Sequence, residues 1–526
     1  MIQIAADRSF AGRIRRPDPK EKSDRADPAG ASQRHLGKEF LKSAERHAIQ
    51  PAFITDQRLM TYREVAELAL GYSAKLQQYA AWRPGKRVAL QLGNSADYIA
   101  AFYGILIAGG VVVPLPLEQS TSWIDQVVGI TEAQWRIDST GVMWSGSNRR
   151  QKRSEGAEDR CLDLNLAAIL FTSGSTGSPK GVMLSHDNFL ANSASICDSL
   201  PIEQSDRALA LLPFCHAFGN SVLQSHLLSG AALVVAGTTA FPESVVDAMK
   251  RHAVTSYSGV PHLHHLLLRG SRLSRESVPT LRYATVAGGA LRRDLLLELA
   301  DQLRPAQFYV MYGQTEATAR LSCLPADEIG SRSGSIGRGI PGVTLEVVDE
   351  QNRPVPPGIP GEIRARGENV MLGYWQDVDA TKQILQDNWL RTGDLATIDK
   401  DGYIYPHGRK SQLLKIRGYR LHPAEVERTI AQQLPDTDPV IVPYETPDGS
   451  DRLALFIIPL QSRQTLELAA VRVCCAQSLP RHQRPDYVTI LDAPPLTPSL
   501  KIDRQLLSRW AAEAVLRYAD PEMSCV

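Results

Sequence analysis

The sequence predicts an α/β fold with a large N-terminal domain of helix-covered mixed sheets and a small antiparallel subdomain, followed by a small, mobile α+β domain. Apolar runs of strand length alternate with segments long enough for helices, which is typical of parallel strands covered on both faces. These runs lie at 87–92, 208–212, 232–236 and 283–287. Around 343–349 and 361–365 the runs are short and turn-separated, which indicates the antiparallel subdomain. A new βαβ-like unit begins near Ser411.

The chain is therefore expected to have three parts. Residues 1–34 are rich in Arg, Asp, Pro and Ser and are predicted to form a flexible extension. Residues 35–410 form the large domain, and residues 411–526 form the mobile C-terminal domain. A chain of 526 residues, 43% of them hydrophobic, is long enough to give each domain its own core.

One uncharged segment, residues 98–117, is nominally long enough to span a bilayer. Gly109 and Gly110 interrupt it, and Pro114 follows the next apolar run. Because glycine pairs form turns and proline ends a central strand, we expect a buried helix, a turn and a short strand, and no membrane span. Met1 is not followed by the charged and apolar regions of an export signal, so export is not expected.

Charge and cysteine usage disfavour several classes of partner. A net charge of +1 gives no overall field for nucleic acid, and the basic stretch 149–153 lacks interleaved aromatic residues and is interpreted as a solvated loop. The seven cysteines lack C-x-x-C spacing and are interpreted as reduced thiols, which predicts a cytoplasmic protein. The histidines within 261–265 have no ligand partner nearby in sequence and are assigned to a helix start rather than to a metal site.

The stretch from Thr172 to Lys180 carries the strongest chemical signal. It follows an apolar run and holds Thr172, Ser173, Gly174, Ser175, Thr176, Gly177 and Lys180. Glycines let backbone N–H groups turn toward an anion, hydroxyls add donors, and the lysine adds charge, so a phosphate-binding loop is predicted. The spacing fits neither common nucleotide fingerprint, which disfavours a kinase or a dehydrogenase. For this motif alone, a Ser/Gly-rich surface turn remains the alternative.

Taken with five further motifs in order, the loop resembles the signature of the adenylate-forming superfamily, which includes acyl-CoA synthetases, acyl-AMP ligases, peptide-synthetase adenylation domains and luciferases. The resemblance extends from about residue 35 to about residue 510. The further motifs are LPFCHAFG at 212–219, YGQTE at 312–316, RTGD at 391–394, GRKSQLLKIRGYR at 408–420 and LTPSLKIDR at 496–504. The resemblance implies an enzyme that joins a carboxylic acid to the AMP portion of ATP, releases pyrophosphate, and transfers the acyl group to a thiol.

The resemblance also implies a set of residues for the phosphates. The loop with Thr172 and Lys180 would hold the β- and γ-phosphates, and Thr172 would count among the catalytic groups. Glu316 would be a ligand of Mg²⁺, and Thr315 would donate to the α-phosphate. Without the resemblance, Glu316 would be interpreted as an ordinary solvated or capping side chain.

The nucleoside would be bound by two further groups of residues. Asp394 would accept hydrogen bonds from both ribose hydroxyls, and Arg409 would contact ribose or phosphate. As a bare string, the motif around Asp394 could equally be a turn. The adenine would lie against a backbone platform and an aromatic ring. The residues implied for adenine are Gly288, Gly289, Ala290, Tyr312, Gly313 and Gln314.

Lys501 is the residue expected to promote adenylation. It lies in the second domain, so domain closure must deliver its flexible positive charge to the α-phosphate and the carboxylate. By spacing alone it would be interpreted as a surface lysine in a proline-rich loop. The family commonly has glycine before this lysine, whereas this chain has Leu500.

A second half-reaction requires that the lysine withdraw so that a thiol can reach the adenylate. Rotation of the C-terminal domain would achieve this, with Ser411 at the hinge and Lys415 and Gly418 lining the thiol channel. The family often has Asp or Lys where this chain has Ser411, which weakens the hinge assignment. Lys415 could instead lie on a solvated strand edge.

The acid pocket is expected around His216, which is also placed among the catalytic residues. Peptide-synthetase domains usually carry an aspartate in this motif to pair an α-ammonium group, and residues 214–220 contain no carboxylate. This favours an acid without an α-amino group. A core histidine bonded to backbone is the alternative for His216. The remaining expected lining residues are Asn220, Ser258, Gly259, Gly288 and Ala317.

The sequence thus predicts an ATP- and Mg²⁺-dependent acyl-CoA synthetase. An acyl-AMP ligase that loads the phosphopantetheine of a carrier protein is the alternative, because both acceptors end in the same thiol. A non-catalytic adenylate-binding protein and a luciferase-like oxidase are two alternatives of other classes. Retention of Lys180, Glu316, Asp394 and Lys501 weighs against the non-catalytic protein.

Overall fold

The structure is a computed structural model of the chain. It describes residues 34–144, 165–172, 179–237, 241–412, 414–416, 419–435, 437–446, 450–459, 466–497 and 501–519. Several predicted features therefore lie outside the described residues. These are the extension up to residue 33, the basic stretch 149–153, and Ser173, Gly174, Ser175, Thr176, Gly177, Gly418 and Leu500.

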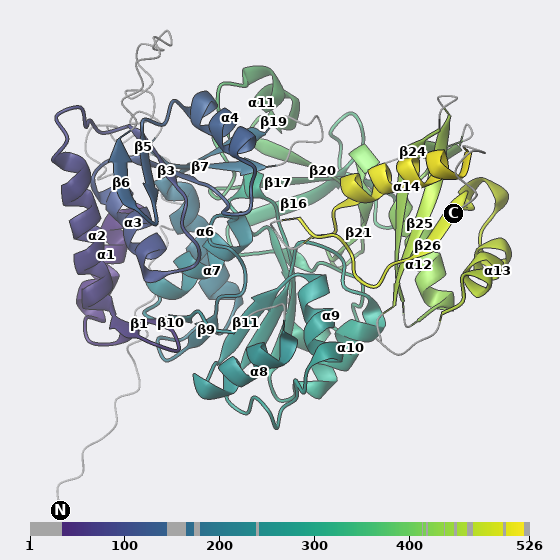
Figure 1. The fold of residues 1–526 in the computed structure, drawn as a ribbon, viewed down its shortest axis with the longest axis horizontal. Helices are drawn as coiled ribbons and strands as arrows, with labels where there is room; N and C mark the ends of the chain where they lie inside the picture. The colour runs from purple at the N-terminus through teal and green to yellow at the C-terminus, as the bar shows by residue number, and fades with distance from the viewer. Residues whose placement is uncertain are drawn as a thin grey trace, which may run out of the picture.

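A seven-stranded sheet occupies the N-terminal part of the chain and carries the ends of the phosphate loop (Figure 1). Strands β7, β4, β3 and β5 are parallel, β6 runs antiparallel to β5, and β8 runs antiparallel to both of its neighbours, β7 and β18. In order across the sheet the strands are β18 (Gly373–Tyr374), β8 (Lys180–Ser185), β7 (Leu166–Thr172), β4 (Val111–Pro114), β3 (Arg87–Leu90), β5 (Trp135–Asp138) and β6 (Gly141–Trp144).

A nine-stranded sheet forms the second layer of the large domain. It is parallel from β13 to β1, and its outer strands run antiparallel. The order is β15 (Arg338–Gly339), β14 (Ser322–Leu324), β13 (Gln307–Tyr312), β12 (Tyr283–Val286), β11 (Ser256–Gly259), β9 (Arg207–Leu209), β10 (Ala232–Val234), β1 (Pro51–Ile54) and β2 (Leu59–Thr61). The four apolar runs predicted as strands are β3, β9, β10 and β12, as the α/β assignment requires.

The helices pack on these sheets through two main apolar clusters. One cluster joins both sheets through α1 (Leu36–Arg46), α2 (Tyr62–Gln77), α3 (Ala96–Ile107), α6 (His186–Ser199) and α7 (Ala217–Leu228). The other packs α8 (Pro242–Arg251), α9 (Pro261–Gly270) and α10 (Arg293–Gln302) on the nine-stranded sheet. α4 (Thr121–Thr131) adds to a third cluster beside β7. The histidines near 261 lie at the start of α9, as predicted.

The uncharged segment 98–117 folds as predicted from its glycines and proline. Ser95 caps α3 by accepting a hydrogen bond from the Tyr98 amide, Gly109 turns the chain with φ of 77°, and β4 ends at Pro114. Most of α3 is buried because it packs on α2 and the sheet. Within the described ranges, no helix is both long enough and apolar enough to cross a membrane.

The antiparallel subdomain follows, and its sheet has the order β16 (Val343–Val348), β17 (Gly361–Gly367), β20 (Trp389–Ile398) and β19 (Leu385–Gln386), with β21 (Ile404–Arg409) paired to β20. α11 (Val378–Ile384) precedes β19. β18 lies within this part of the sequence but leaves the subdomain to pair with β8, so it ties the subdomain to the phosphate loop.

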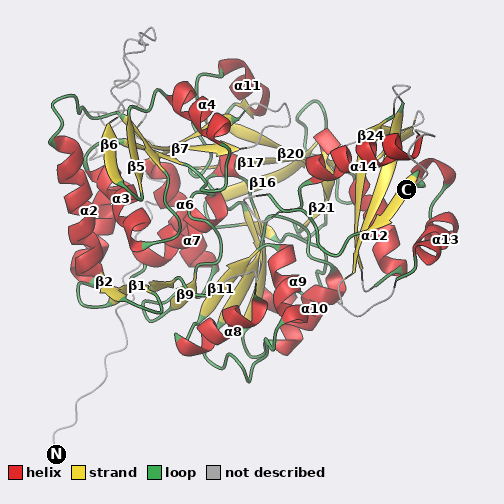
Figure 2. Cartoon of the chain, viewed as in Figure 1, coloured by secondary structure: helices red, strands yellow, loops and turns green. Residues whose placement is uncertain are grey.

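The C-terminal part has the mixed α+β character that the sequence predicts (Figure 2). Its elements are β22 (Leu414–Ile416), β23 (Tyr419–Leu421), α12 (Pro423–Gln433), β24 (Thr437–Glu445), β25 (Asp451–Pro459), α13 (Leu468–Ser478), β26 (Tyr487–Ile490) and α14 (Arg504–Ala519). β25 pairs antiparallel with β24 and parallel with β26. Arg292 Nη1 donates to the Thr437 carbonyl at 2.6 Å, which links α10 to β24.

Candidate functional site

Both ends of the phosphate loop are fixed by strand pairing. Thr172 is the last residue of β7 and lies opposite Lys180, the first residue of β8. The residues between them are therefore closed into a loop at one end of the seven-stranded sheet. The ammonium nitrogen of Lys180 lies 5.1 Å from the centre of the Tyr374 ring, which attracts it as a cation over an aromatic face.

Glu316 is connected to the same tyrosine. The Tyr374 hydroxyl donates to Glu316 Oε1 at 2.7 Å, and the Met371 amide donates to the Glu316 carbonyl. Because β18 pairs with β8, Tyr374 lies between the loop lysine and the predicted magnesium ligand. This contact places Lys180 and Glu316, which are far apart in sequence, in one site.

A tight turn brings Glu316 to this position. A Cβ at Gly313 would lie 1.7 Å from the Ala319 carbonyl oxygen, so only glycine fits between β13 and the returning chain. Gln314 precedes η1 (Thr315–Ala317), and Thr315 begins it. Ala317 is fully buried in an apolar cluster with Leu321, Ala365 and Leu390, so its side chain contributes to packing.

Asp394 is held by two of the other predicted residues. Its Oδ2 accepts from the Tyr312 hydroxyl at 2.6 Å, and its Oδ1 accepts from Arg409 Nε at 3.1 Å. The pairing of β20 with β21 sets Asp394 directly opposite Arg409. Burial disfavours the charge of Arg409, but Asp394, Tyr312 and Glu316 together raise the pKa of Arg409 above its usual value. The guanidinium therefore stays charged.

Lys501 reaches this cluster from the C-terminal domain. Thr497 and Lys501 are joined by three hydrogen bonds. The Thr497 amide and the Thr497 hydroxyl donate to the Lys501 carbonyl at 2.7 and 3.1 Å, and the Lys501 amide donates to Thr497 Oγ1 at 3.2 Å. Although the residue as a whole is exposed, burial of its amino group lowers the pKa of Lys501 and the charge of Arg409 lowers it further. The negative charges of Asp394 and Glu316 act in the opposite direction, so the amino group lies within electrostatic range of all three side chains.

The backbone platform lies directly against Lys501. Gly288 follows β12 with φ of 85°, and a Cβ there would lie 3.4 Å from Lys501 Cε and 3.3 Å from Val260 Cγ1. Gly289 and Ala290 continue the chain and are exposed, as is Gly288. Glycine is required at 288 because its conformation is left-handed and its surroundings are close.

His216 occupies the N-cap position of α7 and makes no side-chain capping hydrogen bond there. Its Nε2 is buried without a hydrogen-bond partner among the described residues, so the interpretation as a histidine bonded to backbone is not supported at that atom. Burial and then the charge of Lys501 lower the pKa of His216 to about 4, so the imidazole is neutral at pH 7. Burial raises the pKa of neighbouring Cys215 to about 12, which leaves a thiol without nucleophilic character.

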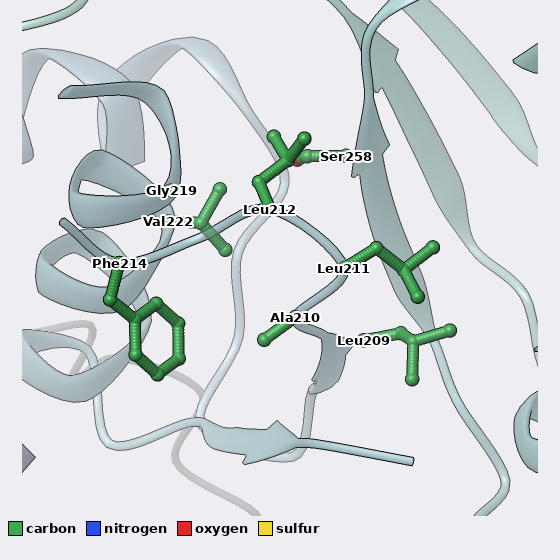
Figure 3. Close-up of a pocket in the computed structure, with 8 residues that line it drawn as sticks. All are labelled: Leu209, Ala210, Leu211, Leu212, Phe214, Gly219, Val222 and Ser258. Atoms are coloured by element: carbon green, nitrogen blue, oxygen red, sulfur yellow. The ribbon is translucent and has the colours of Figure 1, made fainter. Parts of the chain in front are cut away.

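A narrow apolar crevice, partly open to solvent, lies beside the first turns of α7 (Figure 3). Its lining residues are Leu209, Ala210, Leu211, Leu212, Phe214, Gly219, Val222 and Ser258. Ser258 is the one predicted pocket residue in this lining, and its hydroxyl accepts from Thr285 Oγ1. Gly259 follows it against His264, and Asn220 bonds the Phe214 carbonyl and Gln224.

The predicted hinge and thiol-channel residues lie at the start of the C-terminal part. Ser411 is exposed within η3 (Lys410–Gln412), between β21 and β22, and Lys415 lies on β22. Of the cysteines, the five in the described ranges, at 197, 215, 323, 474 and 475, are unpaired.

Sequence reasoning missed Tyr374. Its motif, Leu-Gly-Tyr-Trp at 372–375, has no spacing that suggests a ligand, and 57 residues separate it from Glu316. The only available signal was a glycine before an aromatic residue, which is common in turns. The pairing of β18 with β8 reveals the role of this tyrosine, and that pairing is a long-range feature of the fold.

The chain resembles known proteins in both sequence and fold. The family model described as AMP-binding enzyme matches residues 40–375. The long-chain-fatty-acid–CoA ligase of Escherichia coli is 28% identical over 89% of this chain and 93% of that protein. The feruloyl-CoA synthase of an Amycolatopsis species is 30% identical over 70% of this chain and 76% of that protein.

Solved structures share the fold over nearly the whole chain. ATP-bound MatB from Rhodopseudomonas palustris superposes with a TM-score of 0.77 at 24% identity, covering 91% of this chain and 99% of that one. The o-succinylbenzoate coenzyme A synthetase from Bacillus subtilis, in complex with ATP and magnesium ion, gives 0.74 at 23% identity, covering 89% and 98%.

Proposed function

The chain belongs to the AMP-binding enzyme family, and from this membership we propose how its site carries out the reaction of an acyl-CoA synthetase. The protein is an AMP-forming acid–thiol ligase. It activates a carboxylic acid with ATP and passes the acyl group to a thiol. The observation that carries the proposed mechanism is the meeting of Lys501, Arg409, Glu316 and Asp394, which come from separate parts of the chain.

In the first half-reaction, a carboxylate oxygen attacks the α-phosphorus of ATP, the bond to the bridging oxygen breaks, and pyrophosphate leaves. Two anions must approach each other, so the site must supply positive charge where charge develops. We assign this role to Lys501, which can reach the acid and the α-phosphate, and to Arg409. Lys180 and Thr172, at the two ends of the phosphate loop, hold the departing pyrophosphate.

The residues present fit Mg²⁺ bound together with ATP. Magnesium takes one or two carboxylates plus phosphate oxygens and water, and Glu316 offers one carboxylate oriented by Tyr374. When bound, the ion neutralises phosphate charge. No cluster of three or more ligating side chains is found in the described ranges, so Glu316 is the proposed protein ligand.

Asp394 is proposed to bind the ribose, with Tyr312 and the platform of Gly288 to Ala290 against adenine. Each carboxylate oxygen of Asp394 already accepts one hydrogen bond, from Tyr312 or Arg409. Each still has a lone pair, so the two oxygens can accept from the two ribose hydroxyls. Tyr312 and Arg409 thus fix the orientation of the carboxylate before the nucleotide binds.

The acid is proposed to lie at His216 with its carboxylate toward Lys501, and to lack an α-amino group. A neutral imidazole with a free Nε2 can hydrogen-bond a carboxylate without holding it as a tight ion pair.

In the second half-reaction, a thiolate attacks the acyl carbon and AMP leaves. We propose coenzyme A as the acceptor, because the long-chain-fatty-acid–CoA ligase and the feruloyl-CoA synthase, which match 89% and 70% of this chain, are named for that acceptor. Rotation of residues 411–526 about Ser411 against residues 35–410 withdraws Lys501, and Lys415 and Gly418 then face the thiol. The five unpaired cysteines of the described ranges suit a reducing compartment, and we propose that the enzyme acts in the cytoplasm.

Acid-dependent exchange of labelled pyrophosphate into ATP tests the proposal. We expect exchange that requires both an acid and Mg²⁺, followed by a CoA thioester detected by mass spectrometry when CoA is added. Binding of ATP without exchange for any acid would identify an adenylate-binding protein instead. Exchange with acylation of a carrier protein, and none of CoA, would identify the carrier as the acceptor.

A further inference from the structure

A buried arginine, Arg320, packs on the first turn of α7, the helix whose N-cap residue is His216. Arg320 is 3% exposed, and its Nε is buried with no hydrogen-bond partner. No ion pair or hydrogen bond involves its guanidinium among the described residues. The guanidinium packs on the ring of Phe218, whose centre lies 4.9 Å from the guanidinium carbon.

This arrangement is unfavourable for the protein in isolation. A buried charge is ordinarily paired with a carboxylate, and a guanidinium has five N–H donors that seek acceptors. The ring face attracts a cation but satisfies none of those donors in the way that oxygen does. Burial lowers the pKa of Arg320 to about 10, so the side chain is still charged at pH 7.

Among the described residues, no acceptor bonds the guanidinium, although polar side chains contact the Arg320 backbone. The amides of Asn192 and Asn369 hold the Arg320 carbonyl at 3.0 and 2.8 Å, but their own oxygens are also buried without partners. These two contacts fix the backbone of Arg320 and thereby the direction of its side chain. A Cβ at Gly313 would lie 2.9 Å from the Arg320 Cα, so the residue also packs on the turn that carries Glu316.

The guanidinium lies at the same end of α7 as the acid site. Phe218 is in the first turn of α7, and His216 is the residue that caps this helix. The two residues are therefore separated by less than one helical turn, about 5.4 Å along the axis. Arg320 and His216 Nε2 are two buried polar groups without partners at one helix end.

We propose that Arg320 binds a second carboxylate of the acid, so that this protein activates dicarboxylic acids. One carboxylate lies at Lys501 and reacts, and the other forms a bidentate ion pair with the guanidinium. The inference rests on the proposed function and names its substrate class. It explains why a charged residue stays buried at a site where an apolar side chain would stabilise the fold.

The test compares acids of equal carbon number in pyrophosphate exchange with the full-length protein. The pairs are succinate with butyrate, glutarate with pentanoate, and adipate with hexanoate. For at least one pair we expect kcat/KM to favour the dicarboxylate by about 10-fold or more, as a charge-assisted ion pair supplies. Arg320→Met is expected to lower kcat/KM for the dicarboxylate alone, which brings the ratio to about one. Arg320→Lys should keep part of the preference for the dicarboxylate.

Arg338→Met is the matched control, because the Arg338 guanidinium also stacks on an aromatic ring, that of Tyr403, at 4.7 Å, away from the proposed acid site. It should leave the ratio unchanged. Thermal unfolding gives a second readout. If Arg320 serves to bind substrate and has no partner in the folded protein, the Arg320→Met variant should have a melting temperature equal to or above that of the wild type. A structural arginine predicts a lower one.

Three results would overturn the inference. The first is a wild-type preference for the monocarboxylate in every pair, which needs no variant and so does not depend on folding. The second is an unchanged ratio in Arg320→Met. The third is exchange with no acid of either class, which is distinguishable from the others because it rejects the proposed function itself.

Discussion

Single residues in this site are held by one another. Tyr374 contacts Lys180 and Glu316, Tyr312 and Arg409 contact Asp394, and the charge of Lys501 is opposed by Arg409 and supported by the carboxylates. Such mutual contacts restrict the side chains before any ligand binds. Reorganisation during the reaction is then small, which is a condition for strong electrostatic stabilisation.

Replacing Lys501 tests the source of charge for adenylation. Lys501→Ala should reduce pyrophosphate exchange by about 100- to 1,000-fold, the loss typical for one preorganised stabilising group. Transfer to CoA from chemically prepared acyl-adenylate should be retained, because the proposed domain rotation withdraws the lysine before that step. Lys382→Ala, on α11, is the control, and wild-type exchange in Lys501→Ala would contradict the assignment.

The pH dependence of exchange reports the same group. Because burial and Arg409 lower the pKa of Lys501, its charge is lost at a lower pH than that of an ordinary lysine. As pH rises, pyrophosphate exchange should therefore begin to fall at a pH lower than the usual lysine pKa of about 10.4. This limb should be absent from the residual activity of Lys501→Ala.

Tyr374 is predicted to be a positioning residue that acts through Glu316. Tyr374→Phe removes the 2.7 Å hydrogen bond and should raise the Mg²⁺ concentration needed for half-maximal exchange by about 10-fold. Tyr72→Phe is the matched control, since the Tyr72 hydroxyl donates to Asp97 at 3.0 Å outside the site. An equal loss of kcat with an unaltered Mg²⁺ response would contradict the positioning role.

Residue types in motifs were predictable from the sequence, and their partners were not. The phosphate loop, Glu316 and Asp394 stand out because their chemistry is local to a short motif. Tyr374 and Arg320 have ordinary sequence surroundings, and their importance depends on which side chains the fold brings near them or keeps away from them. Contacts of this kind depend on long-range pairing, which periodicity and composition do not encode.

At the level of elements, β24 contains a carboxyl group in an unfavourable position. Burial and then the charge of Glu427 raise the pKa of Asp438 to about 6, although Arg504 and Arg292 oppose the shift. Arg504 is itself engaged by both oxygens of Glu427, at 2.6 and 3.0 Å. The strand therefore favours the protonated form of Asp438.

The sign of the resulting pH effect follows from this raised pKa. The folded state binds the Asp438 proton more tightly than the unfolded state, so stability falls as pH rises from about 4 to about 6. At pH 7.5, Asp438→Asn should therefore raise the melting temperature, with a gain of at most about 3 kcal/mol. The gain should vanish at pH 4.

Asp492→Asn, at an exposed site of the same domain, serves as the control and should have little effect at either pH. A gain for Asp438→Asn of equal size at both pH values would mean that titration of Asp438 is not its cause.

Element types were predicted well where local signals agreed. The segment 98–117 could be assigned because two glycines and a proline specify a helix, a turn and a strand. Sheet order could not be assigned. Nothing local places β18 beside β8, or β1 beside β10, because these pairings join residues about 180 or more positions apart.

At the level of the whole molecule, the described arrangement is the one in which Lys501 faces the large domain. Arg292 contributes to it, since its Nη1 donates to the Thr437 carbonyl at 2.6 Å. Its Nε also bonds Asp294 at 3.1 Å, which holds the guanidinium in place. Arg292 thus connects α10 with the C-terminal domain while remaining outside the proposed nucleotide site.

Removing this contact should shift the balance between the two domain arrangements. Arg292→Ala is expected to lower pyrophosphate exchange by about 3- to 10-fold, the equivalent of one hydrogen bond, and to leave transfer from prepared acyl-adenylate unchanged or faster. Neighbouring Arg293→Ala is the control because that side chain is exposed. Equal losses in both half-reactions would indicate damage to the fold.

The pairing of β18 with β8 in the seven-stranded sheet has a practical consequence for making hybrids of this protein with its relatives. In a hybrid joined between residues 340 and 370, β18 would come from one parent and β8 from the other. Tyr374 would then contact a lysine and a glutamate from a different parent, at positions 180 and 316. A junction after Arg409 keeps Lys180, Glu316 and Tyr374 from one parent. Hybrids joined there should therefore preserve nucleotide binding while the C-terminal part is exchanged.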